Sequence, residues 1–143
     1  MKHARYLKHA RYSDWPARLA AYIGAVRDRP FEWGRFDCAL FAAGAVMALT
    51  GRDPAAGLAG TYADAVGAAR TLRALSAADV EHLATLRLGD PIPPALAQRG
   101  DVVSVDTDAG PALGVCLGGT AAVPGPAGLE FLAAPLWRHA WRL

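Results

Sequence analysis

The sequence predicts one α+β domain, with helices in the first two thirds of the chain and an antiparallel sheet in the last third. Residues 13–90 carry apolar side chains at helical spacing, whereas residues 101–143 carry short apolar runs separated by turn residues. The chain has 143 residues, 53% of them apolar, which is enough for one buried core. We therefore expect no internal boundary and assign residues 13–143 to a single domain.

The first predicted helix spans residues 13–28. Ser13 can act as its N-cap, and Pro16 falls in the first turn, where a missing backbone N–H is tolerated. Arg29-Pro30 ends the helix. Its buried face is predicted to carry Leu19, Tyr22, Ile23 and Val26.

A second helix is predicted from Asp37 to Gly51. Asp37 can cap its start, and Gly51 suits the position that follows a helix end. Between these ends the segment is apolar all round, so we expect it to be the central, buried helix. Cys38 lies in its first turn.

Two shorter helices and five strands complete the predicted fold. Each helix follows a hydroxyl residue with an acid three positions later, Thr61 with Asp64 and Ser76 with Asp79, which is the spacing of a capping box. The predicted strands cover residues 101–105, 112–117, 120–123, 129–132 and 137–143.

The composition excludes several kinds of protein. No stretch reaches the roughly 18 consecutive apolar residues that a membrane span needs, and residues 1–12 do not resemble a secretory signal. We therefore expect a soluble protein made in a cytoplasm. A formal net charge of +2 gives no reason to expect a nucleic-acid partner. Two cysteines and no Cys/His cluster predict neither a disulfide framework nor a metal or cofactor.

Residues 1–12 form a basic leader with a short internal duplication. Residues 2–6 read Lys-His-Ala-Arg-Tyr, and residues 8–12 repeat that sequence. Its cations and tyrosines could hold an acidic partner or a nucleic-acid backbone. The alternative is a solvated, frayed terminus.

Cys38 is the most informative residue for function. A helix N-terminus stabilises a thiolate and can lower the pKa of a cysteine below its free value of about 8.5. Nucleophilic cysteines use this position together with a histidine from elsewhere in the fold. The alternative is a cysteine that only packs in the core.

Four motifs follow one known order. They are Trp33-Gly34, Asp37-Cys38-Ala39-Leu40-Phe41, Arg99-Gly100-Asp101-Val102-Val103, and Ala-Leu-Gly-Val-Cys-Leu-Gly at residues 112–118. Together they resemble the NlpC-type cell-wall cysteine peptidases, a family with a papain-like fold. In particular, the chain resembles the small members encoded in the tail gene clusters of phages and phage-like gene transfer particles.

The resemblance implies that Cys38 is the nucleophile and that a histidine at the start of the second strand is its base. Ala112 occupies that histidine position, and the third polar position of the family falls in the Ala-Ala-Val of residues 121–123. The family turns the strand face of Ala112 and Cys116 toward the nucleophile. Because alanine cannot accept a proton, the resemblance implies a fold that has lost its catalytic pair.

The first functional interpretation is a structural or binding component of the tip or hub of a phage-type tail. It would be made in the bacterial cytoplasm, be carried in the tail of the particle, contact other tail proteins, and recognise peptidoglycan without cutting it. The aromatic loop before Cys38 supplies the expected contact residues, since these residue types are enriched at interface centres. They are Phe31, Trp33, Arg35 and Phe36. The alternative for an aromatic residue in this loop is burial in the core of the domain itself.

The alternative is an active endopeptidase that cleaves peptidoglycan stem peptides with Cys38. Its base would then be His139 or a group from a partner chain. By the period of a strand, His139 shares a face with Trp137 and Trp141, so it could also simply pack between the indoles. His82 is expected on a helix surface.

Overall fold

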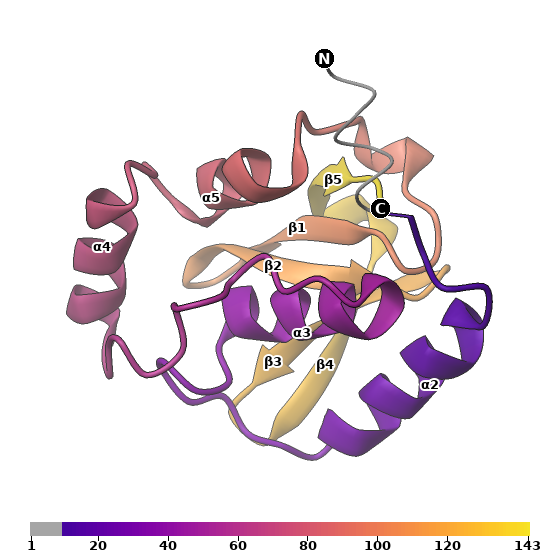
Figure 1. The fold of residues 1–143 in the computed structure, drawn as a ribbon, viewed down its shortest axis with the longest axis horizontal. Coiled ribbons are helices and arrows are strands. Elements are labelled where there is room, and N and C mark those ends of the chain that lie inside the picture. The colour runs from indigo at the N-terminus through magenta and orange to yellow at the C-terminus, as the bar shows by residue number, and fades with distance from the viewer. Residues whose placement is uncertain (1–9) are drawn as a thin grey trace.

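Four helices precede the sheet along the chain in the computed structural model, which describes residues 10–143 (Figure 1). The predicted α+β class is therefore confirmed. The helices are α2 (Trp15–Val26), α3 (Cys38–Thr50), α4 (Ala65–Ala74) and α5 (Val80–Leu88). The strands are β1 (Val102–Thr107), β2 (Gly110–Cys116), β3 (Thr120–Gly125), β4 (Gly128–Ala133) and β5 (Trp137–Trp141). Short 3₁₀ turns η1 (Pro94–Leu96) and η2 (Ala134–Leu136) precede β1 and β5.

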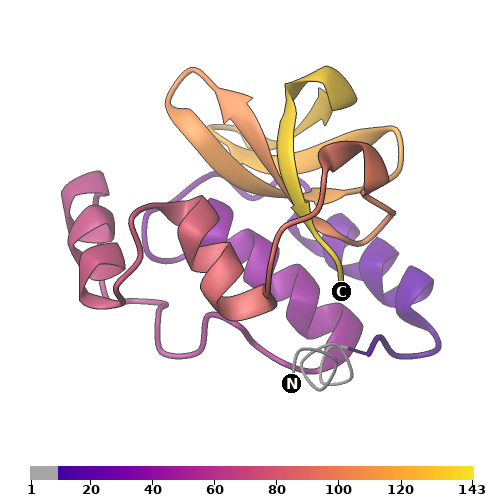
Figure 2. The same ribbon diagram turned by 90° about the horizontal axis from the view of Figure 1, so that it is seen from above.

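The five strands form one antiparallel sheet in the order β4-β3-β2-β1-β5. The last strand thus pairs with the first and not with its neighbour in sequence. Figure 2 shows the helices gathered on one side of a strongly curved sheet. The prediction of a five-stranded antiparallel sheet is confirmed, and every strand end lies within two residues of its expected position.

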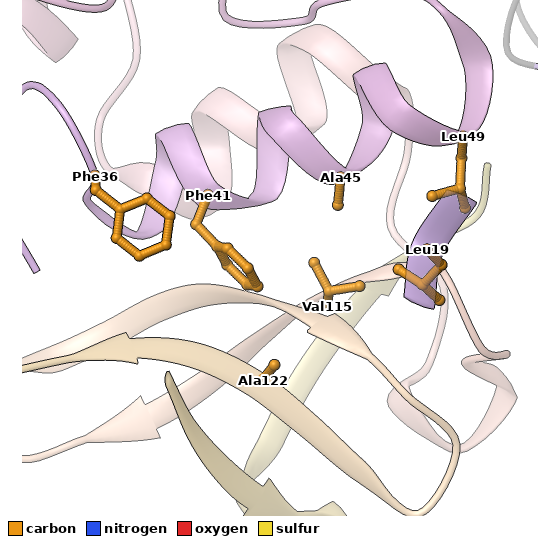
Figure 3. Close-up of a cluster of buried hydrophobic side chains, with 7 residues drawn as sticks. All are labelled: Leu19, Phe36, Phe41, Ala45, Leu49, Val115 and Ala122. Atoms are coloured by element: carbon orange, nitrogen blue, oxygen red, sulfur yellow. The ribbon is translucent and has the colours of Figure 1, made fainter. Parts of the chain in front are cut away.

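α3 is the central helix, as its apolar composition predicts. The Asp37 side chain accepts a hydrogen bond from the Leu40 N–H at 3.0 Å, and Gly51 ends the helix with a φ of 78°. Small side chains on the helix and on β3 let α3 lie close to the sheet. The buried cluster that joins α2, α3, β2 and β3 consists of Leu19, Phe36, Phe41, Ala45, Leu49, Val115 and Ala122 (Figure 3).

The sheet face turned away from α3 is buried as well. The sheet curves around the apolar side chains of this face, and the segment around η1 closes it where Ile92 forms a β-bridge with Ala140. β1 and β2 therefore carry apolar side chains on both faces. The buried residues of this second face are Val103, Val105, Cys116, Ala121, Val123 and Ala140.

β5 contains a bulge that changes which residues share a face. Ser104 of β1 pairs with His139 and Val105 pairs with Trp137, so Arg138 is the extra residue between them. Trp137 consequently packs on the face away from α3, whereas Trp141 packs on the face toward it. The expectation that Trp137, His139 and Trp141 share one face is wrong, because the bulge interrupts the period of two.

Acids and not hydroxyls cap the two shorter helices. Asp64 accepts the Gly67 N–H at 2.7 Å, and Asp79 accepts the His82 N–H at 2.8 Å. The helices therefore begin after these acids, three residues later than the capping-box spacing predicted. An aspartate in extended backbone is itself a strong N-cap, so no preceding hydroxyl is needed.

The end of the predicted leader packs against the domain. Arg11 Nη2 lies 2.8 Å from Oδ1 of Asp101, which is buried, and the same oxygen accepts the Leu143 N–H at 3.3 Å. Asp101 thus joins segments from both ends of the chain, and the packed region begins before Ser13. Residues 1–9, with the first copy of the repeat, lie outside the described residues.

Candidate functional site

Cys38 is the first residue of α3, and the carboxylate of Asp37 organises the backbone around it. Asp37 is 2% exposed. It accepts the N–H groups of Leu40 and Gly34, both at 3.0 Å, and the hydroxyl of Tyr62. One carboxylate therefore fixes the aromatic loop, the helix start and the segment before α4.

A small apolar cavity lies beside Cys38. Its volume is about 30 Å³, which leaves room for little more than a water molecule. Trp33 and Tyr62 form part of its wall, and α4 closes it with residues that include Thr71 and Leu72. No residue of α4 is itself buried. α4 therefore covers the cavity at Cys38, although the helix itself is anchored only weakly to the core.

The surroundings of Cys38 favour the protonated thiol. Its pKa is raised to about 11, chiefly by burial, and the negative charge of Asp37 acts in the same direction. A hydrogen bond from the Leu113 backbone opposes the shift. The net direction is upward, so the expected activation of this thiol by the helix N-terminus is outweighed by burial.

The strand residue that lies against Cys38 is Leu113. Cys38 packs against the buried cluster between α3, α5 and the sheet, which contains Leu113, Val102 and Trp141. Ala112 and Cys116 belong instead to the cluster on the opposite face of the sheet. The expectation that their face turns toward Cys38 is therefore wrong. Leu113 cannot accept a proton, so the position next to the thiol still lacks a base.

His139 lies two strands away from the residue that meets Cys38. Leu113, Ser104 and His139 pair across β2, β1 and β5 in one row, and two strand spacings correspond to about 10 Å. The His139 side chain is 46% exposed, and its Nε2 lies 3.7 Å from Glu81 Oε2. The structure thus brings His139 to Glu81 and not to Cys38.

Glu81 is the centre of a polar network that sequence reasoning missed. Its carboxylate accepts the Ser104 hydroxyl at 2.7 Å and the Arg138 Nε–H at 3.0 Å. Arg138 also reaches Asp106 at 3.2 Å. These contacts lower the pKa of Glu81 despite its burial. They tie α5 to β1 and β5, which makes the network an anchor for the helix.

The predicted contact loop is only partly available for binding. Phe36 is 3% exposed and packs edge-on against Phe41, so its expected role as a contact residue is wrong. Trp33 is 39% exposed and meets Phe31 edge-to-face at 4.8 Å. Arg35 is exposed and pairs with Glu32 at 3.4 Å. Trp33 and Arg35 thus remain as surface groups.

The remaining candidates take structural roles. Cys116 is fully buried on the sheet face away from α3, which excludes direct pairing with Cys38, and both thiols are free. His82 is exposed, as expected, and its Nδ1 accepts the Ala78 N–H at 2.9 Å. Among residues 10–143, no group of His, Cys, Asp and Glu could hold a metal ion. Over the same residues, no helix is long and apolar enough to cross a membrane.

The geometry defines an α+β domain with a protonated cysteine at the start of its central helix and an apolar strand residue against it. The chain belongs to the DUF6950 family, a domain of unknown function, whose model matches residues 10–143. That match includes Arg11 and Tyr12, the last residues of the predicted leader. No curated protein matches the chain.

Proposed function

We propose that the protein is a non-catalytic binding component with an NlpC-like, papain-type fold. The observation that carries this proposal is the environment of Cys38. Its thiol has a raised pKa, and the neighbouring strand offers it Leu113 in place of a base. Acyl transfer by a cysteine needs a thiolate and a group that returns a proton to the leaving amine. Neither requirement is met by the residues around Cys38.

We further propose that the protein acts in the tip or hub of a phage-type tail, where it contacts other tail proteins. This assignment rests on the order of the four sequence motifs, which resembles the small tail-encoded members of the NlpC-type family. An organised loop with exposed aromatic and basic groups, Trp33 and Arg35, is suited to protein contacts. Peptidoglycan is a second partner for the same surface.

Muropeptide release from purified cell-wall sacculi tests the absence of catalysis. The wild-type chain and Cys38→Ser are incubated with sacculi of several wall chemotypes, and the soluble products are read by mass spectrometry. We expect the same baseline from both proteins. A product released by the wild type and absent with Cys38→Ser would overturn the non-catalytic assignment.

Particle composition tests the tail assignment separately. Gradient-purified particles from the phage or bacterium that encodes the chain should contain it in a fixed ratio to the other tail proteins. Deletion of its gene should give particles with an incomplete tail tip. Particles that lack the chain and keep a normal tail would contradict the proposal, whatever the sacculi show.

An active cysteine endopeptidase is the second candidate. It is favoured by the position of Cys38 at a capped helix N-terminus, by the hydrogen bond from the Leu113 backbone, and by the cavity beside the thiol. Its base would have to come from a partner chain, or from His139, which lies two strand spacings, or about 10 Å, from Leu113 in the sheet. Cysteine-dependent muropeptide release is the result that would establish this candidate.

A further inference from the structure

We propose that a groove on α2 binds an acidic amphipathic helix of a partner protein. The groove lies between α2 and the residue that follows β2, and its volume is about 300 Å³. Leu19, Ile23 and Leu117 supply apolar lining. An apolar groove of this kind is a common docking site for the apolar face of a helix.

Two cations border the groove, and no acidic residue lines it. They are Arg27 and Arg99, both exposed. Within residues 10–143 neither forms an ion pair. Each guanidinium instead lies over an aromatic ring, Arg27 at 5.5 Å from Phe131 and Arg99 at 5.7 Å from Trp15. Stacking leaves the N–H edges of a guanidinium free to bind a carboxylate.

The side of the groove formed by α2 allows a close approach. Ala20 and Gly24 lie one helical turn apart in its lining, and both are exposed. A Cβ added to Gly24 would meet nothing within 4 Å. These small residues leave space for the side chains of a second helix, and the flanking cations favour acids beside its apolar stripe.

The groove is separate from the Cys38 site. Figures 1 and 2 place α2 and α4 at opposite ends of the molecule, and none of the groove residues lines the cavity at Cys38. The inference rests on the proposed function in one respect, namely that the protein works by binding other proteins. Its test uses no sacculi or particles, so its failure is distinguishable from failure of the proposed function.

The test measures binding of a designed peptide to the full chain by fluorescence anisotropy. The probe is a labelled alanine-based helix of about 18 residues with leucines at i, i+3, i+4 and i+7 and glutamates on both sides of that stripe. A matched peptide carries glutamine at every glutamate position. We expect the acidic peptide to bind about tenfold more tightly, because only its carboxylates can pair with Arg27 and Arg99.

Two kinds of variant locate the binding. Arg27→Gln and Arg99→Gln should each weaken binding of the acidic peptide about threefold to tenfold, and leave the glutamine peptide unaffected. Gly24→Leu should weaken both peptides at least about tenfold by filling the groove, without lowering the melting temperature. Arg70→Gln with Arg73→Gln, two exposed arginines of α4, makes a larger charge change outside the groove and should have no effect.

Equal binding of the acidic and glutamine peptides would overturn the acidic character of the partner. Unchanged binding to a folded Gly24→Leu variant would overturn the groove as the site. Sedimentation of the chain alone supplies a third outcome: self-association that Gly24→Leu abolishes would assign the groove to a second copy of this chain and overturn a foreign partner.

Discussion

Leu113 lies against Cys38, and its pairing partner on β1, Ser104, stands between it and His139. The sheet register therefore places His139 two strand spacings from Leu113, the strand residue at the thiol. His139 lies instead beside Glu81, whose carboxylate accepts hydrogen bonds from Ser104 and Arg138. The residues around the thiol include Leu113, Trp33 and Tyr62, none of which supplies an imidazole, and this arrangement predicts how Cys38 will react.

Cys38 in the folded protein should be alkylated slowly by iodoacetamide at pH 7. The thiolate is the reacting species, and burial raises the pKa of Cys38 to about 11. We expect the alkylation rate of Cys38 at pH 7 to be at least about tenfold lower in the folded protein than in the urea-unfolded chain, where the pKa of its thiol is about 8.5. Peptide mapping by mass spectrometry separates Cys38 from Cys116. A folded-state rate that levels off by pH 7 would show a primed nucleophile and contradict this expectation.

Installing a base at the strand position next to the thiol should raise the reactivity of Cys38. Leu113→His places an imidazole against Cys38, and we expect the alkylation rate at pH 7 to rise about tenfold or more. Ala112→His is the matched control, because Ala112 faces the other side of the sheet and should leave the rate unchanged.

Leu113→Asn controls for the loss of a buried leucine, since it loosens the packing without adding a base. Circular dichroism establishes that each variant is folded before its rate is compared. A larger rate increase in Ala112→His than in Leu113→His would mean that β2 turns its other face to the helix.

Stability should fall in alkaline solution, and Cys38 should account for part of that loss. Because its pKa is higher in the folded than in the unfolded chain, the folded state favours the neutral thiol. This contribution is fully present below about pH 8.5 and is lost as the pH rises toward about 11. Urea unfolding at several pH values should show a shallower alkaline decline for Cys38→Ala. If the free energy of unfolding falls equally with pH in the wild type and in Cys38→Ala, the pKa of Cys38 is not raised by folding.

Tyr62 should stabilise the start of α3 through its hydroxyl. Tyr62→Phe removes one hydrogen bond to a buried carboxylate, and we expect a loss of about 1–3 kcal/mol in the free energy of unfolding. Asp37→Ala should cost more, because the bonds from Gly34 and Leu40 are lost as well. If Tyr62→Phe unfolds at the wild-type urea concentration, the hydroxyl contributes nothing to stability.

The sequence predicted which segments form helices and strands, because each has a clear periodicity and clear end signals. It did not predict which face of β2 meets α3. Leu113 and Val115 are apolar on one face, and Ala112 and Cys116 are apolar on the other, so alternation cannot distinguish the two. The environment of Cys38 depends on that choice of face.

Long-range contacts explain the other differences. The bulge at Arg138 is set by pairing of β5 with β1, some 30 positions earlier in the chain. The bond from Tyr62 to Asp37 spans 25 residues and leaves no local pattern. Phe36 belongs to a loop by sequence, yet the adjacent helix start draws it into the core beside Phe41. Each of these requires the folded chain and not only its local sequence.

Two helical glycines should respond to alanine in opposite directions. Gly24→Ala adds a methyl group in open space on α2, so the higher helix propensity of alanine should stabilise the protein by about 0.5–1 kcal/mol. Gly44 on α3 lies against the hydroxyl of Tyr22, which donates to the Phe41 carbonyl at 2.7 Å. Gly44→Ala should displace that ring and cost about 1–3 kcal/mol. Urea unfolding measures both, and a destabilised Gly24→Ala would mean that another group occupies the groove in solution.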